Sequence, residues 1–244
     1  MQKLTVILMV LSLASCQYSA EQAQQVVDQA IAAHGQTKLD QVKISFDFRD
    51  KRYSAYRTPE KYVYTRLFVD SLELVEDVLV NSSKFTRLIN GDTTEVIDSM
   101  ATKYSNSVNS VLYFVQLPYL LNDPAVIKSY EGTQRIEGAE YDVIKVQFRA
   151  GDGGADFTDE YRYWFNQQTS MLDYLAYNYQ TNGGGVRFRE AYNRSDRMGI
   201  TFQDYINYEV PIGTSLGDIP SLFEKGQLKE LSRIINEDIK VTKR

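Results

Sequence analysis

The stretch "YNYQTNGGGVRFREAYN", residues 177–193, sets three consecutive glycines between two runs of aromatic and charged residues. A glycine-rich loop binds phosphate when a helix follows it, because the free N–H groups at the helix N-terminus face the anion. The residues after these glycines alternate instead, with Val186 and Phe188 on one side and Arg187 between them on the other, which is a strand pattern. The Asn-Gly pair at 182–183 supplies the positive φ of a tight turn. The stretch therefore predicts a β-hairpin and no phosphate site.

The same alternation recurs in "KISFDFR" (43–49), "YDVIKVQFR" (141–149) and "ITFQDYINY" (200–208). The chain contains 18 tyrosines and 11 phenylalanines, and aromatic residues favour strands because they fit a pleated, half-covered surface. Short turns such as "NGD" (90–92) connect successive runs and imply antiparallel neighbours. We predict an α+β protein that is mainly β, with one large curved antiparallel sheet forming an open half-barrel.

Helices are expected at three places. Residues 20–33 carry apolar side chains at helical spacing, and Gly35 follows as a stop. Within 99–121, apolar residues spaced by three and four form one stripe, and the segment ends near a proline. This second helix is expected to cover the concave side of the sheet. A short helix near 219–231 and a last strand at 238–242 complete the prediction.

The chain of 244 residues carries 27 basic and 32 acidic residues, a net charge of −5. It shows no run of lysine or arginine, so the electrostatic footprint of a nucleic-acid binder is missing. We expect no nucleic-acid partner. The length is sufficient for a proper core.

The first residues, "MQKLTVILMVLSLASC" (1–16), combine an early lysine with an apolar run of signal-peptide length. The last four resemble the bacterial lipobox, in which the cysteine is acylated and becomes the first residue. Cys16 is the sole cysteine of the chain, so an internal disulfide is impossible. We expect a signal peptide at 1–15, cleaved before Cys16, and a single domain over 16–244. The alternative is an ordinary signal peptide with a chance cysteine.

Metal and cofactor sites are not expected. His34, the sole histidine, lies at the end of the first predicted helix and has no Cys/His partner, so a capping role is favoured over a metal ligand. The acidic stretch "GDGGADFTDE" (151–160) lacks EF-hand spacing and is interpreted as a solvated loop. No Gly-x-Ser-x-Gly nucleophile motif is present.

Two carboxylates occupy apolar strand positions. Glu190 lies between Phe188 and Tyr192 at a period of two, and Asp204 lies likewise between Phe202 and Ile206. A buried pair of this kind could act as acid and base. Because Arg162, Arg187 and Arg189 lie on nearby predicted strands, paired structural carboxylates or a solvated barrel mouth are favoured over catalysis.

Four stretches carry a family resemblance: "HG" (34–35), "YSNSVNSVLYF" (104–114), "LPYLLNDPAV" (117–126) and "DYLAYNYQTNGGGVRFREAYN" (173–193). They resemble an uncharacterised family of bacterial lipoproteins, best represented in Bacteroidetes, over nearly the whole chain after the leader. The order of elements also resembles the LolA/LolB and RseB-like lipoprotein-carrier fold. That resemblance implies a concave apolar side that accepts acyl chains, although fold alone does not establish function.

The first hypothesis is a non-enzymatic envelope lipoprotein, anchored to the outer membrane, that binds a lipid or another apolar ligand between sheet and helices. The second is an envelope interaction or sensor module whose cavity is filled, and the third is a hydrolase using the two carboxylates. The candidate residues for the cavity are Leu112, Val115, Tyr163, Phe165, Tyr174, Ala176, Phe188, Glu190, Phe202 and Asp204.

Overall fold

The computed structural model describes residues 2–58, 60–81, 83–149, 159–180 and 183–243, with side chains from residue 17 onward. The chain divides into two compact units. Unit 1 comprises Met1–Ala33, Leu121–Tyr192 and Tyr205–Arg233. Unit 2 comprises His34–Leu120, Asn193–Asp204 and Ile234–Arg244.

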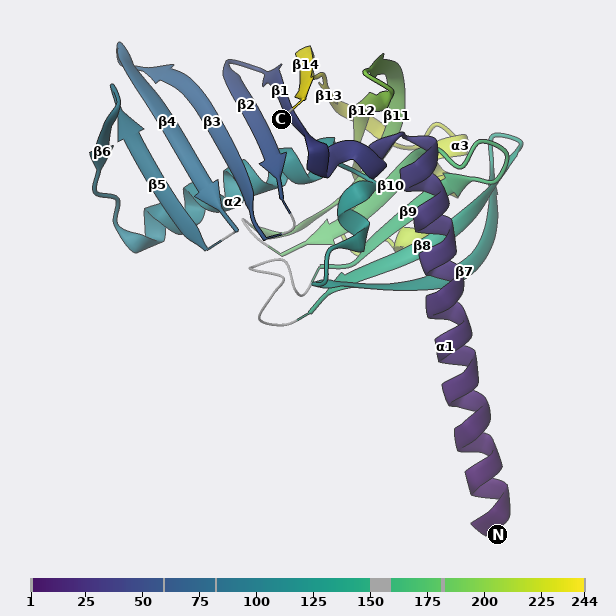
Figure 1. The fold of residues 1–244 in the computed structure, drawn as a ribbon. Coiled ribbons are helices and arrows are strands. Elements are labelled where there is room, and N and C mark those ends of the chain that lie inside the picture. Colours follow the sequence, from purple (N-terminus) through teal and green to yellow (C-terminus); the bar gives the residue numbers. More distant parts are fainter. Residues whose placement is uncertain (1, 59, 82, 150–158, 181–182, 244) are drawn as a thin grey trace. The chain divides into compact units, whose positions relative to one another are not determined.

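The described strands form two seven-stranded sheets (Figure 1). Sheet A has the order β14-β1-β2-β3-β4-β5-β6, and its strands are β1 (Val42–Phe48), β2 (Lys51–Arg57), β3 (Tyr62–Asp70), β4 (Glu73–Val80), β5 (Lys84–Ile89), β6 (Asp92–Thr94) and β14 (Glu237–Lys243). Sheet B has the order β13-β12-β11-β10-β9-β8-β7, and its strands are β7 (Val126–Ile136), β8 (Ala139–Phe148), β9 (Tyr161–Asn166), β10 (Leu172–Tyr179), β11 (Gly185–Arg197), β12 (Ile200–Val210) and β13 (Lys229–Ile234).

The predicted fold class is confirmed, since the protein is mainly β and its hairpin-connected strands pair antiparallel. The strands are shared between two open sheets, where the sequence pattern suggested one large sheet. Local alternation defines strands and hairpins but does not say where a sheet ends. Here sheet A ends at the three-residue strand β6, and the chain then continues into a helix.

In unit 2, helix α2 (Asp98–Val115) packs on strands of sheet A. The predicted stripe is correct, because Val108 and Leu112 are buried. The helix is shorter than predicted and ends before Pro118, followed by the 3₁₀ helix η2 (Tyr119–Asn122). The core of unit 2 lies between α2 and the sheet. Its buried members are Leu39, Val42, Ile44, Phe46, Tyr53, Ala55, Tyr64, Leu79, Val108, Leu112, Ile200 and Phe202.

In unit 1, helix α1 (Gln2–Ala33) packs along the edge strand β7 (Figure 1). It ends where the sequence predicted, because Gly35 adopts a left-handed φ of 65° before the 3₁₀ helix η1 (Gln36–Gln41). Ala23, Val27 and Ala30 on one side of the helix are fully buried. The helix therefore contributes an apolar stripe to unit 1, as its spacing indicated.

The segment between β12 and β13 is the 3₁₀ helix η5 (Leu216–Asp218) followed by α3 (Ile219–Glu224). The predicted helix at 219–231 is therefore too long. Lys225 closes α3, and Gly226 follows with a φ of 64°. The residues from Lys229 then alternate and add β13 to sheet B.

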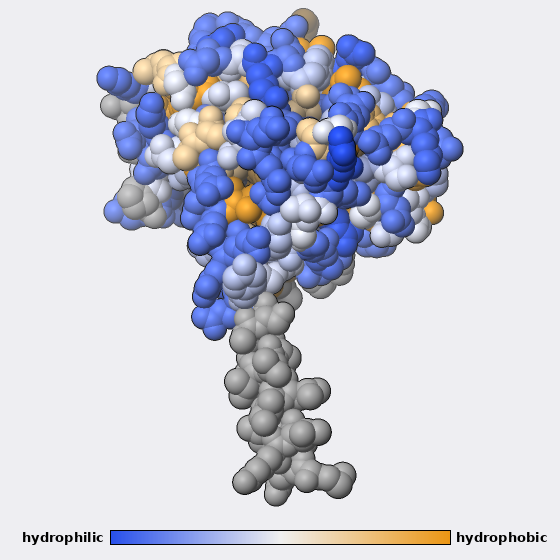
Figure 2. Space-filling model, turned by 90° about the vertical axis from the view of Figure 1, so that its right-hand side faces the viewer, coloured by the Kyte–Doolittle hydropathy of each residue, from blue (hydrophilic) through white to orange (hydrophobic). Residues whose placement is uncertain are grey.

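The surface is mixed in polarity. The face shown in Figure 2 is mainly hydrophilic, with separate apolar spots. The described chain contains no helix that combines the length and apolarity needed to cross a membrane. The large apolar side chains that are exposed are Tyr18, Val69, Leu72, Leu74, Ile97, Ile127, Met198, Ile212, Leu231 and Ile235.

Candidate functional site

The glycine stretch forms the predicted hairpin. Strands β10 and β11 pair antiparallel across it, with Tyr179 opposite Gly185. Gly183 and Gly184 have φ values of 89° and 76°, which other residues rarely adopt. Asn182 lies outside the described residues. The glycines therefore turn the chain, and a strand follows them where a phosphate site would need a helix.

The structure divides the predicted cavity residues between the two units. Tyr163, Phe165, Tyr174, Ala176, Phe188 and Glu190 belong to unit 1, whereas Leu112, Val115, Phe202 and Asp204 belong to unit 2. Leu112 and Phe202 are buried in the core of unit 2, and Val115 packs against it. The sequence could not show this division, because alternation identifies inward positions without naming the core that they join.

The unit 1 residues also lie on two faces of sheet B. In the strand register, Trp164 is opposite Tyr174, while Tyr163 is opposite Leu175. Paired residues point to the same face and successive residues to opposite faces. Tyr163 and Phe165 therefore point away from the face that carries Tyr174. The expectation that Tyr163, Phe165 and Phe188 line one surface is wrong.

Five rings form an aromatic cluster on the other face, here defined as Trp164, Tyr174, Phe188, Tyr208 and Phe223. Phe188 lies at its centre, with ring centroids 5.5 Å from Tyr174 and 6.0 Å from Trp164. Trp164, Tyr174 and Phe188 are each 5% exposed or less. Offset and edge-on contacts at these separations stabilise aromatic pairs beyond the burial of their area.

Helix α3 closes the aromatic cluster with a single ring. Phe223 lies 5.1 Å from Phe188, 5.4 Å from Tyr208 and 5.6 Å from Tyr174, measured between ring centroids. Ile219 of the same helix is fully buried against this core. The face that the sequence assigned to a cavity is therefore occupied by the chain's own side chains in this structure.

Glu190 lies at the border of the aromatic cluster. Its Oε2 accepts a hydrogen bond of 2.9 Å from the Tyr208 hydroxyl. Burial raises the pKa of the Glu190 carboxyl, the hydrogen bond from Tyr208 lowers it, and the charge of Glu137 raises it further. The Tyr174 hydroxyl donates to Glu137 at 3.2 Å. Two hydroxyls of the cluster thus point to carboxylates at one edge.

Asp204, in unit 2, is buried and held by neutral donors. Its Oδ2 accepts from the Asn193 side chain at 2.6 Å, and its Oδ1 accepts from the Asn236 backbone N–H at 2.9 Å. Glu190 belongs to unit 1. Each carboxylate thus has hydrogen-bond partners within its own unit.

The three arginines expected near these carboxylates have described partners of their own. Arg162 forms ion pairs with Glu131 and Glu160. Arg187 lies over the Tyr179 ring, and Arg189 donates to the Tyr177 hydroxyl at 2.9 Å. Strand register sets the neighbours of Arg187 and Arg189.

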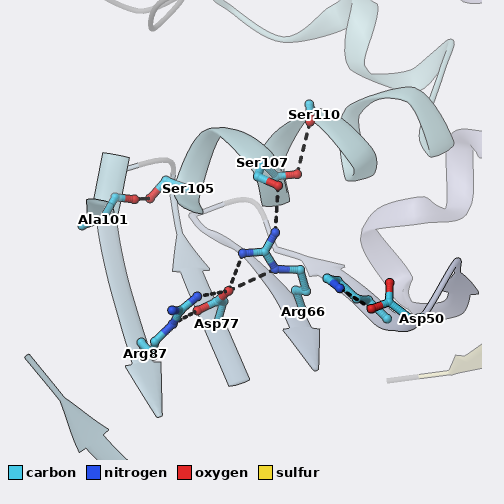
Figure 3. A network of polar contacts seen from close by, with 9 residues as sticks. Asp50, Arg66, Asp77, Arg87, Ala101, Ser105, Ser107 and Ser110 are labelled. Atoms are coloured by element: carbon cyan, nitrogen blue, oxygen red, sulfur yellow. Dashed lines mark hydrogen bonds and ion pairs between the residues drawn. The ribbon is translucent and has the colours of Figure 1, made fainter. Parts of the chain in front are cut away.

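A buried charge network in unit 2 was missed in the sequence. Asp77 is completely buried and accepts two N–H groups from Arg66, at 3.0 and 2.5 Å, and two from Arg87, at 2.7 and 3.0 Å (Figure 3). Arg66 also donates to Ser107 of α2 at 2.8 Å, and Arg87 stacks 3.7 Å from the Tyr104 ring centroid. The network attaches α2 to three strands.

A signal for this network was present in the sequence. Arg66, Asp77 and Arg87 each stand between apolar residues two positions away, as in "YVYTRLF" (62–68) and "LVEDVLV" (74–80). A charge at such a position predicts a buried ion pair as soon as neighbouring strands are aligned. The alignment itself comes from the hairpins, which place the three residues directly opposite one another.

The remaining candidates show no metal site. His34 is completely buried, and its carbonyl accepts the Thr201 N–H at 2.8 Å. Most of the acidic stretch 151–160 lies outside the described residues, as does the Cys16 side chain. In the described ranges, no group of three or more His, Cys, Asp or Glu side chains could hold a metal ion.

Together these features define a mainly antiparallel α+β protein with two open sheets, helices packed on them and one closed aromatic cluster. Residues 2–236 match the model of DUF6503, a family of unknown function, and the chain belongs to that family. The predicted resemblance to an uncharacterised family is thereby confirmed. No curated protein matches the chain significantly in sequence.

Several solved structures are similar to the chain at low sequence identity, among them the following three. A LolA superfamily protein from Nitrosomonas europaea has a TM-score of 0.46 and 12% identity, with 89% of this chain and 92% of that chain covered. A putative outer membrane lipoprotein-sorting protein domain from Vibrio parahaemolyticus has a TM-score of 0.41 and 7% identity, over 84% and 99% of the chains. The lipoprotein LppX from Mycobacterium tuberculosis has a TM-score of 0.30 and 13% identity, over 68% and 91%. The predicted LolA-like resemblance agrees with these matches, which at such scores carry no information about function.

Proposed function

We propose that the chain is a non-enzymatic lipoprotein of the cell envelope that binds a lipid or another apolar ligand at the aromatic cluster of unit 1. Residues 1–15 act as a cleaved leader, and the acylated Cys16 anchors the domain 16–244 to the outer membrane. About 0.8 kcal/mol for each buried CH₂ makes several acyl chains a firm anchor.

The position of Phe223 carries the ligand proposal. Its ring contacts three other rings of the aromatic cluster, yet it comes from a helix of only six residues. Two hydrogen bonds tie this segment to β7 and the turn after it: Gln134 donates to the Gly217 carbonyl at 3.1 Å, and the Glu137 N–H donates to Glu224 at 2.8 Å. Each such bond contributes about 1 kcal/mol, and we propose that α3 is the part of this core that a ligand displaces.

The surface beneath Phe223 suits an amphipathic ligand. The rings of Trp164, Phe188 and Tyr174 would form an apolar wall, and the hydroxyls of Tyr174 and Tyr208 stand at one edge beside carboxylates. Ligand sites commonly combine a mainly apolar lining with a few polar groups that fix orientation. An acyl chain or a similar apolar group would take the place of Phe223.

The test measures binding of a fluorescent fatty acid to the mature chain carrying Cys16→Ser, stripped of bound lipid. Phe223→Ala removes the competing ring and should tighten binding by up to about tenfold, if that ring contributes about 1.4 kcal/mol. Phe85→Ala is the matched control, because Phe85 is a partly buried phenylalanine of unit 2 with a ring contact of its own. Equal affinities for wild type, Phe223→Ala and Phe85→Ala would contradict a site under α3.

The lipid anchor has a separate test. Radiolabelled palmitate should enter the full chain and should not enter the Cys16→Ser variant, because the sole thiol is then missing. Incorporation that persists in Cys16→Ser would refute acylation of this residue without affecting the ligand proposal.

A second candidate is an envelope interaction or sensor module with a filled core. The nearly complete burial of Trp164, Tyr174, Ala176 and Phe188 favours it, because residues that line an open cavity keep exposed area. If neither wild type nor Phe223→Ala binds the probe at micromolar concentration, this second function replaces the first.

A further inference from the structure

Helix α1 is fixed to unit 1 immediately after the predicted anchor. The Ser19 hydroxyl donates to the Tyr130 carbonyl at 3.0 Å and accepts the Tyr130 N–H at 3.0 Å. Tyr130 lies in β7, the edge strand of sheet B. A single side chain therefore binds both backbone groups that this residue would otherwise present at the sheet edge. Ser19 stands only three positions after Cys16.

The residues between Cys16 and Ser19 provide no flexible tether. Helix α1 is continuous through them, and Gln17 donates to Glu21 at 3.0 Å, one helical turn away. At about 1.5 Å per residue, three helical residues span only about 4–5 Å. A flexible linker of about 10 residues would by comparison reach about 16–19 Å.

We infer that unit 1 is held directly against the lipid head groups of the membrane that carries its anchor, with the start of α1 and the Tyr130 region of β7 at the surface. This inference depends on the acylation of Cys16 proposed above. The occupant of this surface is the bilayer itself, since the distance from the anchor to Ser19 is shorter than the thickness of a head-group layer.

The side chains at this end of unit 1 suit a head-group layer. Tyr18, which directly precedes Ser19 on α1, is 69% exposed. Tyrosine is favoured at membrane interfaces because its ring is apolar and its hydroxyl remains hydrated. The charged neighbours of Tyr130 are already bound within unit 1, because Lys128 donates to the Leu121 carbonyl at 2.8 Å and Glu131 pairs with Arg162.

This arrangement restricts where the protein acts. A domain on a long tether samples a wide volume, whereas unit 1 would stay at the head-group surface of one leaflet. The apolar ligand would then enter from, or leave to, that same leaflet. A ligand carried to an opposite membrane would need a soluble carrier.

The test uses the full, acylated chain in phosphatidylcholine vesicles that contain lipids with nitroxide-labelled head groups. Ala20→Cys and Ala32→Cys form a matched pair, because both alanines are exposed on α1 and lie about 18 Å apart along the helix at about 1.5 Å per residue. Acylated Cys16 leaves the new cysteine as the sole free thiol for a fluorophore. Quenching should be strong at position 20 and weak at position 32.

An insertion variant tests whether quenching at position 20 results from the short tether or from accidental contact of the protein with the vesicle. A Gly/Ser segment of about 12 residues inserted between Gln17 and Tyr18 extends the reach to about 20 Å and should remove the strong quenching at position 20. Equal quenching at both positions, or quenching unaffected by the insertion, would overturn the inference. If the chain does not sediment with vesicles at all, the anchor fails and the inference fails with it, whereas fatty-acid binding by the Cys16→Ser chain is unaffected.

Discussion

Ala176 of β10 lies directly opposite Phe188 of β11, and both side chains are completely buried. The sequence placed Ala176 inside the protein by alternation, and this position is correct. The cavity hypothesis also allowed for a void beside Ala176, in which a large side chain would be tolerated. Both Ala176 and Phe188 belong to the buried core of unit 1.

We therefore expect Ala176→Trp to lower the free energy of unfolding by about 1–3 kcal/mol, the usual cost of overpacking. Urea denaturation of the two proteins measures the difference. Ala32→Trp, at an exposed position of α1, serves as the control and should change stability by less than about 0.5 kcal/mol. An Ala176→Trp protein as stable as wild type would show that space exists beside Phe188.

Asp77 is predicted to be the most sensitive charged residue of unit 2. Asp77→Asn leaves the buried guanidinium of Arg66 and the partly buried guanidinium of Arg87 without a carboxylate, and breaking a buried pair from one side costs about 3–5 kcal/mol. Asp47→Asn is a matched control, because Asp47 also binds an arginine of sheet A, Arg52, but in a pair that is 36–40% exposed. The control should cost about 1 kcal/mol or less.

The double variant Asp77→Asn/Arg87→Met distinguishes the contribution of the buried charges to stability from the contribution of packing. Removing one of the two guanidinium groups reduces the unpaired charge, so the double variant should be more stable than Asp77→Asn alone. Thermal unfolding of wild type, the two single variants and the double variant gives the interaction free energy between Asp77 and Arg87. Additive losses would show that the network contributes through packing alone.

Glu190 should make the stability of unit 1 depend on pH. Its pKa is raised above the ordinary value of 4.5, chiefly by burial, so the folded protein holds this proton more tightly than the unfolded chain. The contribution of Glu190 to stability is complete below that ordinary value and is lost as the pH rises through the raised pKa. Glu190→Gln should therefore melt at a higher temperature than wild type at pH 7, and the difference should disappear near pH 4.

The control residue for this experiment is Glu230, whose pKa is shifted in the opposite direction. The pKa of Glu230 is lowered, chiefly by its hydrogen bond with Arg233, so its contribution is present above the ordinary pKa and is lost as the pH falls. Glu230→Gln should not melt above wild type at pH 7. A Glu190→Gln protein that melts below wild type at pH 7 would refute the burial argument.

Gly35 explains one of the family stretches, "HG" at 34–35. Its φ is +65°, and a Cβ at this position would lie 1.8 Å from the Gly199 carbonyl oxygen. Gly91 also has a positive φ, of +94°, but a Cβ there meets nothing within 4 Å. Gly91→Ala should cost about 1 kcal/mol for conformation alone, whereas Gly35→Ala should cost about 2–4 kcal/mol, because overpacking is added. Equal losses in denaturant titrations would mean that the Gly199 backbone moves freely.

Much of the local structure could be predicted from the sequence. Alternation identified the strands around Phe46, Phe188 and Phe202, and the glycines at 183–185 identified a hairpin, because both depend on residues close together in the chain. The first helix ended at Gly35 as expected, since a left-handed φ is a property of that residue. The same reasoning placed Ala176 and Glu190 on one face of sheet B.

The candidate site was predictable only in part. Tyr174, Ala176 and Phe188 do belong to one core, but Phe223, which closes it, comes from a segment about 50 positions later in the chain, and no periodicity connects it to β10. Tyr163 was assigned to the wrong face because its neighbour Trp164 is equally apolar. A strand that is buried on both sides, as β9 is, has no polar face to show its orientation.

The sequence by itself determined which segments are strands and where the chain turns, because hydrophobic period and turn chemistry are local properties. It also predicts a lipobox-like leader that ends at Cys16. Only the tertiary structure decided that the strands form two sheets, that the C-terminal strand β14 pairs with β1, and that α3 covers the aromatic cluster. Such contacts join residues far apart in the chain, and their free energy comes from apolar area buried jointly by several elements. No single segment carries that information, so the pairing appears only when the whole chain is folded.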